Sequence, residues 1–201
     1  AQDVLLGEVE QSGAVAAGGG YGQSQEVRLP GVLAGNYYLL VRSDAGGNVF
    51  ESNEANNEAV LPVTLATPDL AVTGLRGPSG GAAGQSVEVV WTVANQGTGS
   101  AQGSWKDRVY FSTDAVWDAQ DVALGSEVVW SSQLAAGASY SQTNTVTLPN
   151  VPAGTYYLLA RSDVRGNVFE SREANNESRS PLELTTVEIS TGPKTVLDSR
   201  Q

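Results

Sequence analysis

The chain has 201 residues and carries 22 acidic against 11 basic side chains, a net charge of −11 at pH 7 that argues against nucleic acid or an anionic membrane as its partner. It has no cysteine, methionine or histidine, which excludes disulfides, thiol catalysis, imidazole bases and the usual zinc and haem ligands. The sequence shows no signal peptide and no long apolar run, so it predicts no membrane insertion.

In chain order, the first feature is one half of an internal repeat. Residues 34–58 match residues 153–177 at an offset of 119, and the match extends back until Ala1 aligns with Ala119. A unit of this length can bury its own core, whereas solenoid units span roughly 20–50 residues. The offset predicts three parts, which are the C-terminal half of a repeat over 1–67, a whole repeat over 68–186, and a tail or the start of a further strand over 187–201.

The whole repeat has the pattern of an all-β domain. Short runs of alternating apolar and polar residues recur between turns rich in Gly, Asn and Pro, and long helical periodicity is absent. The clearest half-buried strand puts Val87, Val89, Trp91 and Val93 on one face. The seven strands predicted in this repeat cover residues 68–75, 86–94, 105–111, 122–130, 140–148, 155–162 and 179–186.

Seven strands in a unit of this length fit a two-sheet Greek-key sandwich of the immunoglobulin type, for which about 100 residues is usual. The predicted fold class is therefore all-β, with immunoglobulin-like β-sandwich domains in tandem, and a flattened barrel of the same strands is the alternative. Residues 153–157 have the pattern of a tyrosine corner, in which Tyr156 is the hydroxyl donor. Asp107 falls on the inner face of its strand, where we expect a hydrogen-bonded or Arg-paired carboxylate.

Five short motifs of the whole repeat carry a family resemblance. They are Pro68–Val72, Val89–Gly97, Val109–Asp114, Ala153–Leu158 and Glu170–Asn176. In this order they resemble the CARDB family, the cell-adhesion-related domain found in bacteria, over all of 68–186 and over half a copy in 1–67. The resemblance implies an immunoglobulin-like sandwich used in tandem on large exported bacterial or archaeal proteins, as a spacer or adhesion module. It thereby implies an extracellular or cell-surface location.

A loop rich in acidic and amide side chains follows the sixth strand, and oxygen ligands recur in it at every third residue. On a single helical turn this spacing places the oxygen atoms on one side, and Ca²⁺ takes such oxygens as its ligands. We therefore predict a calcium site formed by Asp163, Asn167, Glu170, Glu173, Asn175 and Asn176. Its twin in the first copy consists of Asp44, Asn48, Glu51, Glu54, Asn56 and Asn57.

A second and weaker calcium candidate is the loop that carries Asp114, Asp118 and Asp121. In a sandwich of this order the two loops lie at opposite ends, so ions near the joint over residues 64–68 would stiffen a tandem rod. The alternative for both loops is structural, because Asn and Asp stabilise turns by bonding their own backbone. A rod without ions, held by a short linker that contains Pro68, is equally compatible with the sequence.

The sequence predicts a non-catalytic structural or adhesion module, with neighbouring repeats, copies of itself, or a cell-surface protein or polysaccharide as partners. Glu170 and Glu173 invite comparison with the paired carboxylates of glycoside hydrolases, but no nucleophile and base accompany them, so we expect no enzyme. A carbohydrate-binding module is the rival function. Trp117, Trp130 and Tyr157 could stack on sugars, unless they pack in the core.

Residues 1–67 are predicted to hold the last four strands of a sandwich, whose inner face would lack its partner sheet. Such a face rarely stays exposed in a monomer. Either the segment was cut from a longer array, or strands of another chain complete it. Donation of the tail over 187–201 to a neighbouring chain would build a head-to-tail filament by strand addition, although the tail supplies at most two of the three missing strands.

Overall fold

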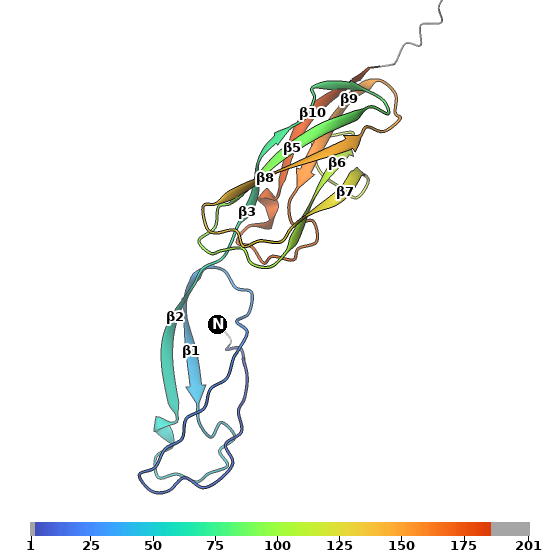
Figure 1. Cartoon of the computed structure of the whole chain (residues 1–201). Coiled ribbons are helices and arrows are strands. Elements are labelled where there is room, and N and C mark those ends of the chain that lie inside the picture. The colour runs from blue at the N-terminus through green and yellow to red at the C-terminus, as the bar shows by residue number, and fades with distance from the viewer. Residues whose placement is uncertain (1–2, 186–201) are drawn as a thin grey trace, which may run out of the picture. The chain divides into compact units, whose positions relative to one another are not determined.

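The computed structural model describes residues 3–185 (Figure 1). The chain divides into two units, Ala1–Val32 and Leu33–Gln201. The predicted tail over 187–201 lies outside the described residues. Within residues 3–185 no helix has the length and apolar character needed to cross a bilayer. The strands and 3₁₀ helices of this part are β1 (Gly35–Arg42), η1 (Glu54–Asn56), β2 (Glu58–Leu65), β3 (Leu70–Arg76), β4 (Gly80–Ala82), β5 (Ser86–Asn95), β6 (Trp105–Ser112), β7 (Val122–Trp130), β8 (Ser139–Thr147), β9 (Gly154–Arg161), η2 (Glu173–Asn175) and β10 (Glu177–Thr185).

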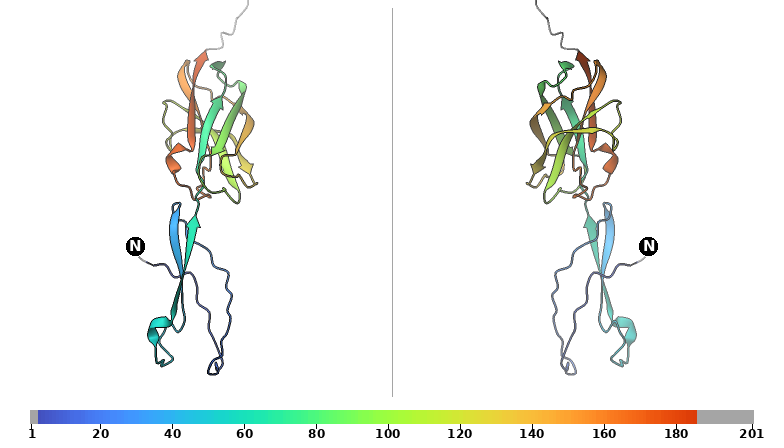
Figure 2. Two further views of the ribbon diagram at one scale, coloured as in Figure 1. Left: turned by 90° about the vertical axis from the view of Figure 1, so that its left-hand side faces the viewer. Right: turned by 90° about the vertical axis from the view of Figure 1, so that its right-hand side faces the viewer.

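Strands β3 to β10 form two sheets that pack face to face (Figure 2). One sheet has the strand order β4-β10-β9-β6-β7 and the other has the order β3-β5-β8. The pairs within them are antiparallel except β10 with β4, which run parallel. The prediction of an all-β fold is confirmed, while the immunoglobulin-type Greek key stays a prediction. The sequence pattern does not predict β4, because its three residues have the composition of a turn. In the structure they pair with the C-terminal end of β10.

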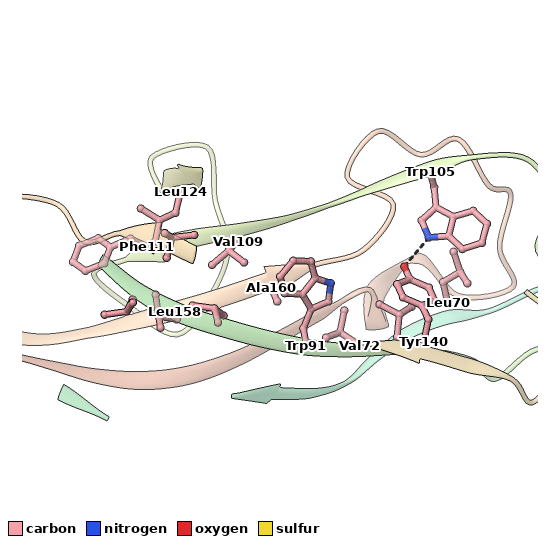
Figure 3. Close-up of a cluster of buried hydrophobic side chains, with 14 of the residues drawn as sticks. Leu70, Val72, Trp91, Trp105, Val109, Phe111, Leu124, Tyr140, Leu158 and Ala160 are labelled. Atoms are coloured by element: carbon pink, nitrogen blue, oxygen red, sulfur yellow. Dashed lines mark hydrogen bonds between the residues drawn. The ribbon is translucent and has the colours of Figure 1, made fainter. Parts of the chain in front are cut away.

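The core lies between these two sheets and follows from the alternation of side chains along the strands. In β5 every second residue from Val87 to Val93 is buried, as the pattern predicts. Trp91 and Trp105 are buried from opposite sheets, together with Leu158 of β9 (Figure 3). Each large side chain removed from water in this way stabilises the fold by about 2 kcal/mol.

Asp107 of β6 lies in this core with an exposed fraction of 1%. Its Oδ2 accepts hydrogen bonds from Trp91 Nε1 at 2.9 Å and from the Tyr140 hydroxyl at 2.7 Å. The Tyr140 oxygen in turn accepts a hydrogen bond from Trp105 Nε1 at 2.8 Å (Figure 3). Burial raises the pKa of Asp107, whereas the hydrogen bonds from Trp91 and Tyr140 lower it. The carboxylate therefore joins the two sheets through hydrogen bonds, as its position in the sequence predicts.

The first copy reproduces the local structure of the second at the offset of 119 residues. β1 pairs with β2 so that Arg42 lies opposite Glu58, and β9 pairs with β10 so that Arg161 lies opposite Glu177. The helices η1 and η2 follow the same offset. Two stretches of nearly the same sequence therefore adopt the same hairpin.

The first copy differs from the second in the part that precedes its hairpin. Four strands are predicted within residues 1–67, but the described residues of this segment form two, β1 and β2. Residues 3–32 contain no strand, although their counterparts include β7 and β8. β7 and β8 pair with β6 and β5, and the sequence has no counterparts of β5 and β6 in the first copy. A strand needs a partner for its N–H and C=O groups, so this stretch forms no sheet pairing.

Candidate functional site

The acidic loop between β9 and β10 is folded around its own backbone. Asp163 has a left-handed conformation (φ 42°), and its carboxylate accepts hydrogen bonds from the N–H groups of Asn167 at 2.9 Å and Val168 at 2.8 Å. Glu173 accepts the N–H of Glu170 at 3.3 Å. Two of the predicted calcium ligands therefore act as turn-forming acceptors, which is what the structural alternative predicts.

Glu170 extends from this loop to the start of β3. Its exposed fraction is 3%, and its Oε2 accepts a hydrogen bond from the N–H of Leu70, which lies 100 residues earlier in the chain. Asn176 Nδ2 donates to the other carboxylate oxygen, Oε1, at 2.9 Å. This buried carboxylate accepts from two donors, and one of them is a backbone N–H that the sheet leaves unpaired at the start of β3.

Two further hydrogen bonds fix the residues just before β3 to the same loop. Ser171 N–H donates to the carbonyl oxygen of Pro68 at 2.8 Å, and Asn175 Nδ2 donates to Asp69 Oδ1 at 3.0 Å. Asp69 is buried. The segment that leads into β3 is thus built into the sandwich.

The loop between β5 and β6 binds this segment as well. The N–H groups of Thr98 and Gly99 both donate to the carbonyl oxygen of Thr67 at 3.0 Å, and Thr98 Oγ1 accepts the N–H of Thr67 at 3.3 Å. Gln96 N–H donates to the carbonyl oxygen of Asp69 at 2.6 Å. The loop therefore uses its main chain to hold the carbonyl groups of Thr67 and Asp69, the residues on either side of Pro68.

Asn95 is the fully buried side chain that organises this second loop. Its Oδ1 accepts the N–H of Asp69 at 3.0 Å, and its Nδ2 donates to the carbonyl oxygens of Gly99 at 2.8 Å and Leu134 at 3.0 Å. We call loops 95–99 and 163–176, together with the segment 67–70 that they bind, the linker clamp.

The linker clamp has no room for a side chain at Gly97. A Cβ atom there would lie 2.4 Å from the carbonyl oxygen of Thr67 and 2.6 Å from the nitrogen of Asp69. At Gly99 it would lie 2.7 Å from the carbonyl oxygen of Ala66. Both distances are well inside van der Waals contact, so glycine is required here for a close approach of two main chains.

Sequence reasoning missed the residues that make the second half of the clamp, namely Asn95, Gly97 and Gly99. The signal that could have found them is the density of Asn and Gly in the turn over residues 95–99, because two nearby glycines often mark a close backbone approach. The sequence pattern does not indicate which chain segment approaches these two glycines.

The pH dependence of stability should report on Glu170. Burial raises its pKa to about 7, Leu70 and Asn176 lower it through hydrogen bonds, and nearby Glu173 and Asp163 raise it further. Because the folded pKa lies above the ordinary value of 4.5, the folded state binds the proton more tightly. This contribution to the free energy of unfolding is fully present below pH 4.5 and is lost as the pH rises through 7, by at most about 3 kcal/mol.

Thermal melts between pH 4 and pH 8 check this expectation. The melting temperature of the wild type should fall relative to that of Glu170→Gln as the pH rises, because the amide does not titrate. Glu51→Gln, at the same position of the first copy, is the matched control and should follow the wild type. Parallel curves for the wild type and Glu170→Gln would contradict the role of Glu170.

The first copy keeps the bonds within its acidic loop. Asp44 accepts the N–H groups of Asn48 at 2.8 Å and Val49 at 3.0 Å, and Glu54 accepts the N–H of Glu51 at 3.0 Å. The described residues show no hydrogen bond to the Glu51 carboxylate that corresponds to the one from the Leu70 N–H to Glu170. Asn56 and Asn57 lie at the end of η1 and just after it.

The third predicted calcium loop also bonds its own main chain. The Asp114 carboxylate accepts a hydrogen bond from the N–H of Val116 at 2.8 Å. The Asp118 carboxylate accepts one from the N–H of Gln120 at 2.7 Å, and the Asp121 carboxylate accepts one from the N–H of Asp118 at 2.9 Å. Within residues 3–185 no group of three or more acidic side chains is placed to hold a metal ion. Calcium binding by any of the three loops stays a prediction.

The aromatic side chains considered for sugar stacking pack against other groups. The Trp130 ring stacks on Tyr140 with centroids 4.0 Å apart, and Trp117 lies under the guanidinium of Arg161 at 3.6 Å. Tyr157 is half-buried. Trp130 packs against the core, which matches the core-packing alternative. Trp117 lies outside the core, and its ring is covered by Arg161 and Tyr110.

The CARDB family model matches residues 67–180, more than half of the sequence. The chain belongs to the CARDB family. CARDB is a family of non-catalytic, adhesion-related domains. No curated protein matches the chain.

Several solved structures resemble this CARDB chain. The CARDB domain of a Pyrococcus furiosus protein, in complex with di-metal ions, is 23% identical, with 59% of this chain and 90% of that domain covered and a TM-score of 0.45. A solution structure of that domain is 22% identical, with coverages of 60% and 98% and a TM-score of 0.46. A β-glucosidase of Erythrobacter marinus is 11% identical, covers 61% of this chain and 16% of the enzyme, and has a TM-score of 0.38. At these identities the likeness concerns the fold alone, and the metal ions belong to the Pyrococcus domain.

Proposed function

We propose that the chain is a non-catalytic adhesion module that acts as a stiff spacer, because the linker clamp fixes the path by which the chain enters the sandwich. The observation that supports this proposal is the linker clamp. Thr67, Asp69 and Leu70 are buried, and Ala66 alone separates them from Leu65 at the end of β2. A flexible linker needs free residues between two folded parts, and one residue gives it little length.

An extracellular or cell-surface setting suits such a spacer, since a stiff array carries adhesive parts away from the surface that bears it. Its partners would be neighbouring repeats, copies of itself, or a cell-surface protein or polysaccharide. Calcium at the acidic loops would add to the stiffness. The filament formed by donation of the tail stays a prediction, because residues 187–201 lie outside the described residues.

A distance distribution across the linker tests the spacer function. The chain has no cysteine, so spin labels attach only at two introduced residues, for example Ala59→Cys in β2 and Gln133→Cys on an exposed loop of the sandwich. We expect a narrow distribution of label distances in this pair. Gly97→Ala should broaden it, because the added Cβ displaces Thr67 from the clamp.

The matched control is Gly74→Ala, whose Cβ would meet Thr92 at an ordinary 3.7 Å. It should leave the distribution narrow. Circular dichroism melts verify that both variants keep the folded sandwich. A distribution as broad in the parent as in folded Gly97→Ala would overturn the spacer function and leave a flexible string of domains.

A further inference from the structure

Three of the four tryptophans in the chain gather around Tyr140 and Asp107 in the core of the sandwich. The Trp130 ring stacks on the Tyr140 ring, with centroids 4.0 Å apart and planes inclined by 11°. Trp105 Nε1 donates to the Tyr140 oxygen at 2.8 Å (Figure 3), and Trp91 Nε1 donates to Asp107 Oδ2 at 2.9 Å. Trp105 and Trp91 are buried, whereas Trp130 is half-buried. Trp130 is therefore the indole of this cluster that meets solvent.

Indole and phenol rings are the side chains of this protein that lose an electron most readily. Thiols and thioethers are the usual targets of oxidants in proteins, and the chain has no cysteine and no methionine. Electron transfer slows steeply with distance, so it is fastest between rings in van der Waals contact. A hole on the Trp130 ring can therefore pass to Tyr140 directly through their stacked faces.

A tyrosine gives up its electron easily only if its hydroxyl proton can leave as well, because the oxidised phenol is a strong acid. The Tyr140 hydroxyl donates to Asp107 Oδ2 at 2.7 Å, so an acceptor for this proton is in place. Burial and the neighbouring Asp107 charge raise the pKa of Tyr140, so the proton stays on the oxygen until the electron leaves. The transfer converts a buried carboxylate into a neutral acid beside a neutral phenoxyl radical, and the loss of a buried charge favours the product.

We propose that Trp130, Tyr140 and Asp107 form a one-electron relay that traps an oxidising hole as a tyrosyl radical. An external one-electron oxidant, such as the azide radical, takes one electron from the Trp130 indole and becomes an anion. Tyr140 then returns one electron to the indole, and its hydroxyl proton moves to Asp107 Oδ2. The net change is one electron passed from Tyr140 to the oxidant and one proton passed within the chain. The relay is independent of the linker clamp, and its function is to spare the indoles of the core from oxidation.

A second Trp–Tyr pair in the same sandwich lacks these features. The rings of Trp117 and Tyr110 meet edge to face, with centroids 6.0 Å apart. The Arg161 guanidinium lies 3.6 Å from the centre of the Trp117 ring, and this positive charge opposes a positive hole on the indole. Among residues 3–185, Tyr140 is the tyrosine whose hydroxyl donates to a carboxylate. The second pair is therefore an internal control for the relay.

Pulse radiolysis of the full chain with azide radicals, followed by the absorbance of the indole and tyrosyl radicals, tests the relay. In the parent chain the indole signal should decay into a tyrosyl signal at a rate that is independent of protein concentration. Tyr140→Phe keeps the stacked ring and should abolish this step, whereas Tyr110→Phe should leave it unchanged. Trp130→Phe should also abolish it, and Trp117→Phe should not. Circular dichroism melts verify that each variant keeps the folded sandwich.

Asp107→Asn tests the role of the proton acceptor. The amide oxygen still accepts a hydrogen bond from the Tyr140 hydroxyl, but it is not a base. The step should then slow by about 100-fold or more, since a positioned proton acceptor contributes a factor of that order. An unchanged rate in folded Asp107→Asn, or an unchanged tyrosyl signal in Tyr140→Phe, would overturn the relay. Loss of the signal in Tyr110→Phe would overturn it as well, because the hole would then settle on the other pair.

Discussion

Replacing Asp107 with alanine should lower the free energy of unfolding of the sandwich by about 4 kcal/mol. The change removes the acceptor of Trp91 Nε1 and of the Tyr140 hydroxyl, both of which point at Asp107 Oδ2 from the opposite sheet. Two buried donors would then lack a partner, and a cavity would remain beside them. Urea unfolding followed by tryptophan fluorescence measures the loss.

Asp107→Asn separates the acceptor from the charge in this network. The asparagine carbonyl can still accept from Trp91 and Tyr140, and burial no longer acts against a charge, so we expect a loss of about 1 kcal/mol or less. A loss for the asparagine variant as large as that for alanine would show that the charge itself holds the sheets together. Wild-type stability in Asp107→Ala would show that the network contributes nothing.

Replacing Leu158 with alanine should cost about 3 kcal/mol, because Leu158 is fully buried between the sheets and its removal leaves a cavity. The same change at Leu39, which occupies the corresponding position of β1, should cost less than about 1 kcal/mol. The two leucines share nearly the same neighbours in sequence and the same strand register. Their environments differ in the sheet that packs against them.

Calorimetry on the two single variants measures this pair of effects. The transition of the sandwich should shift to lower temperature by roughly 10 °C in Leu158→Ala and stay in place in Leu39→Ala. Equal shifts would mean that the hairpin belongs to the same cooperative unit as the sandwich. The comparison needs no outside reference protein, because the chain supplies both environments.

The strands of the sandwich are predictable because local pattern and tertiary packing agree there. In β5 the alternation of Val87, Val89, Trp91 and Val93 matches a face that is buried against the other sheet. The burial of Asp107 is predictable for the same reason, since the alternation of side chains along β6 places it on the buried face of the strand. Periodicity is a local signal, and it suffices where each strand has a neighbour.

The linker clamp could not be predicted from local pattern. Its hydrogen bond from Leu70 to Glu170 joins residues 100 positions apart, and the bond from Asn175 to Asp69 joins residues 106 apart. Acidic and amide side chains can bind an ion, bond their own turn, or bind a distant N–H, and composition does not distinguish these uses. Residues 3–32 illustrate the same limit, because their strand pattern has no partner to pair with.

The clamp has a consequence for how such chains grow. All groups described here that hold residues 67–70 come from the domain that follows them, so this domain carries its own joint. Duplication of one unit in the gene would copy the domain and its joint together. An array could then gain or lose units without any matching change in the neighbours, and its length could be set by copy number alone.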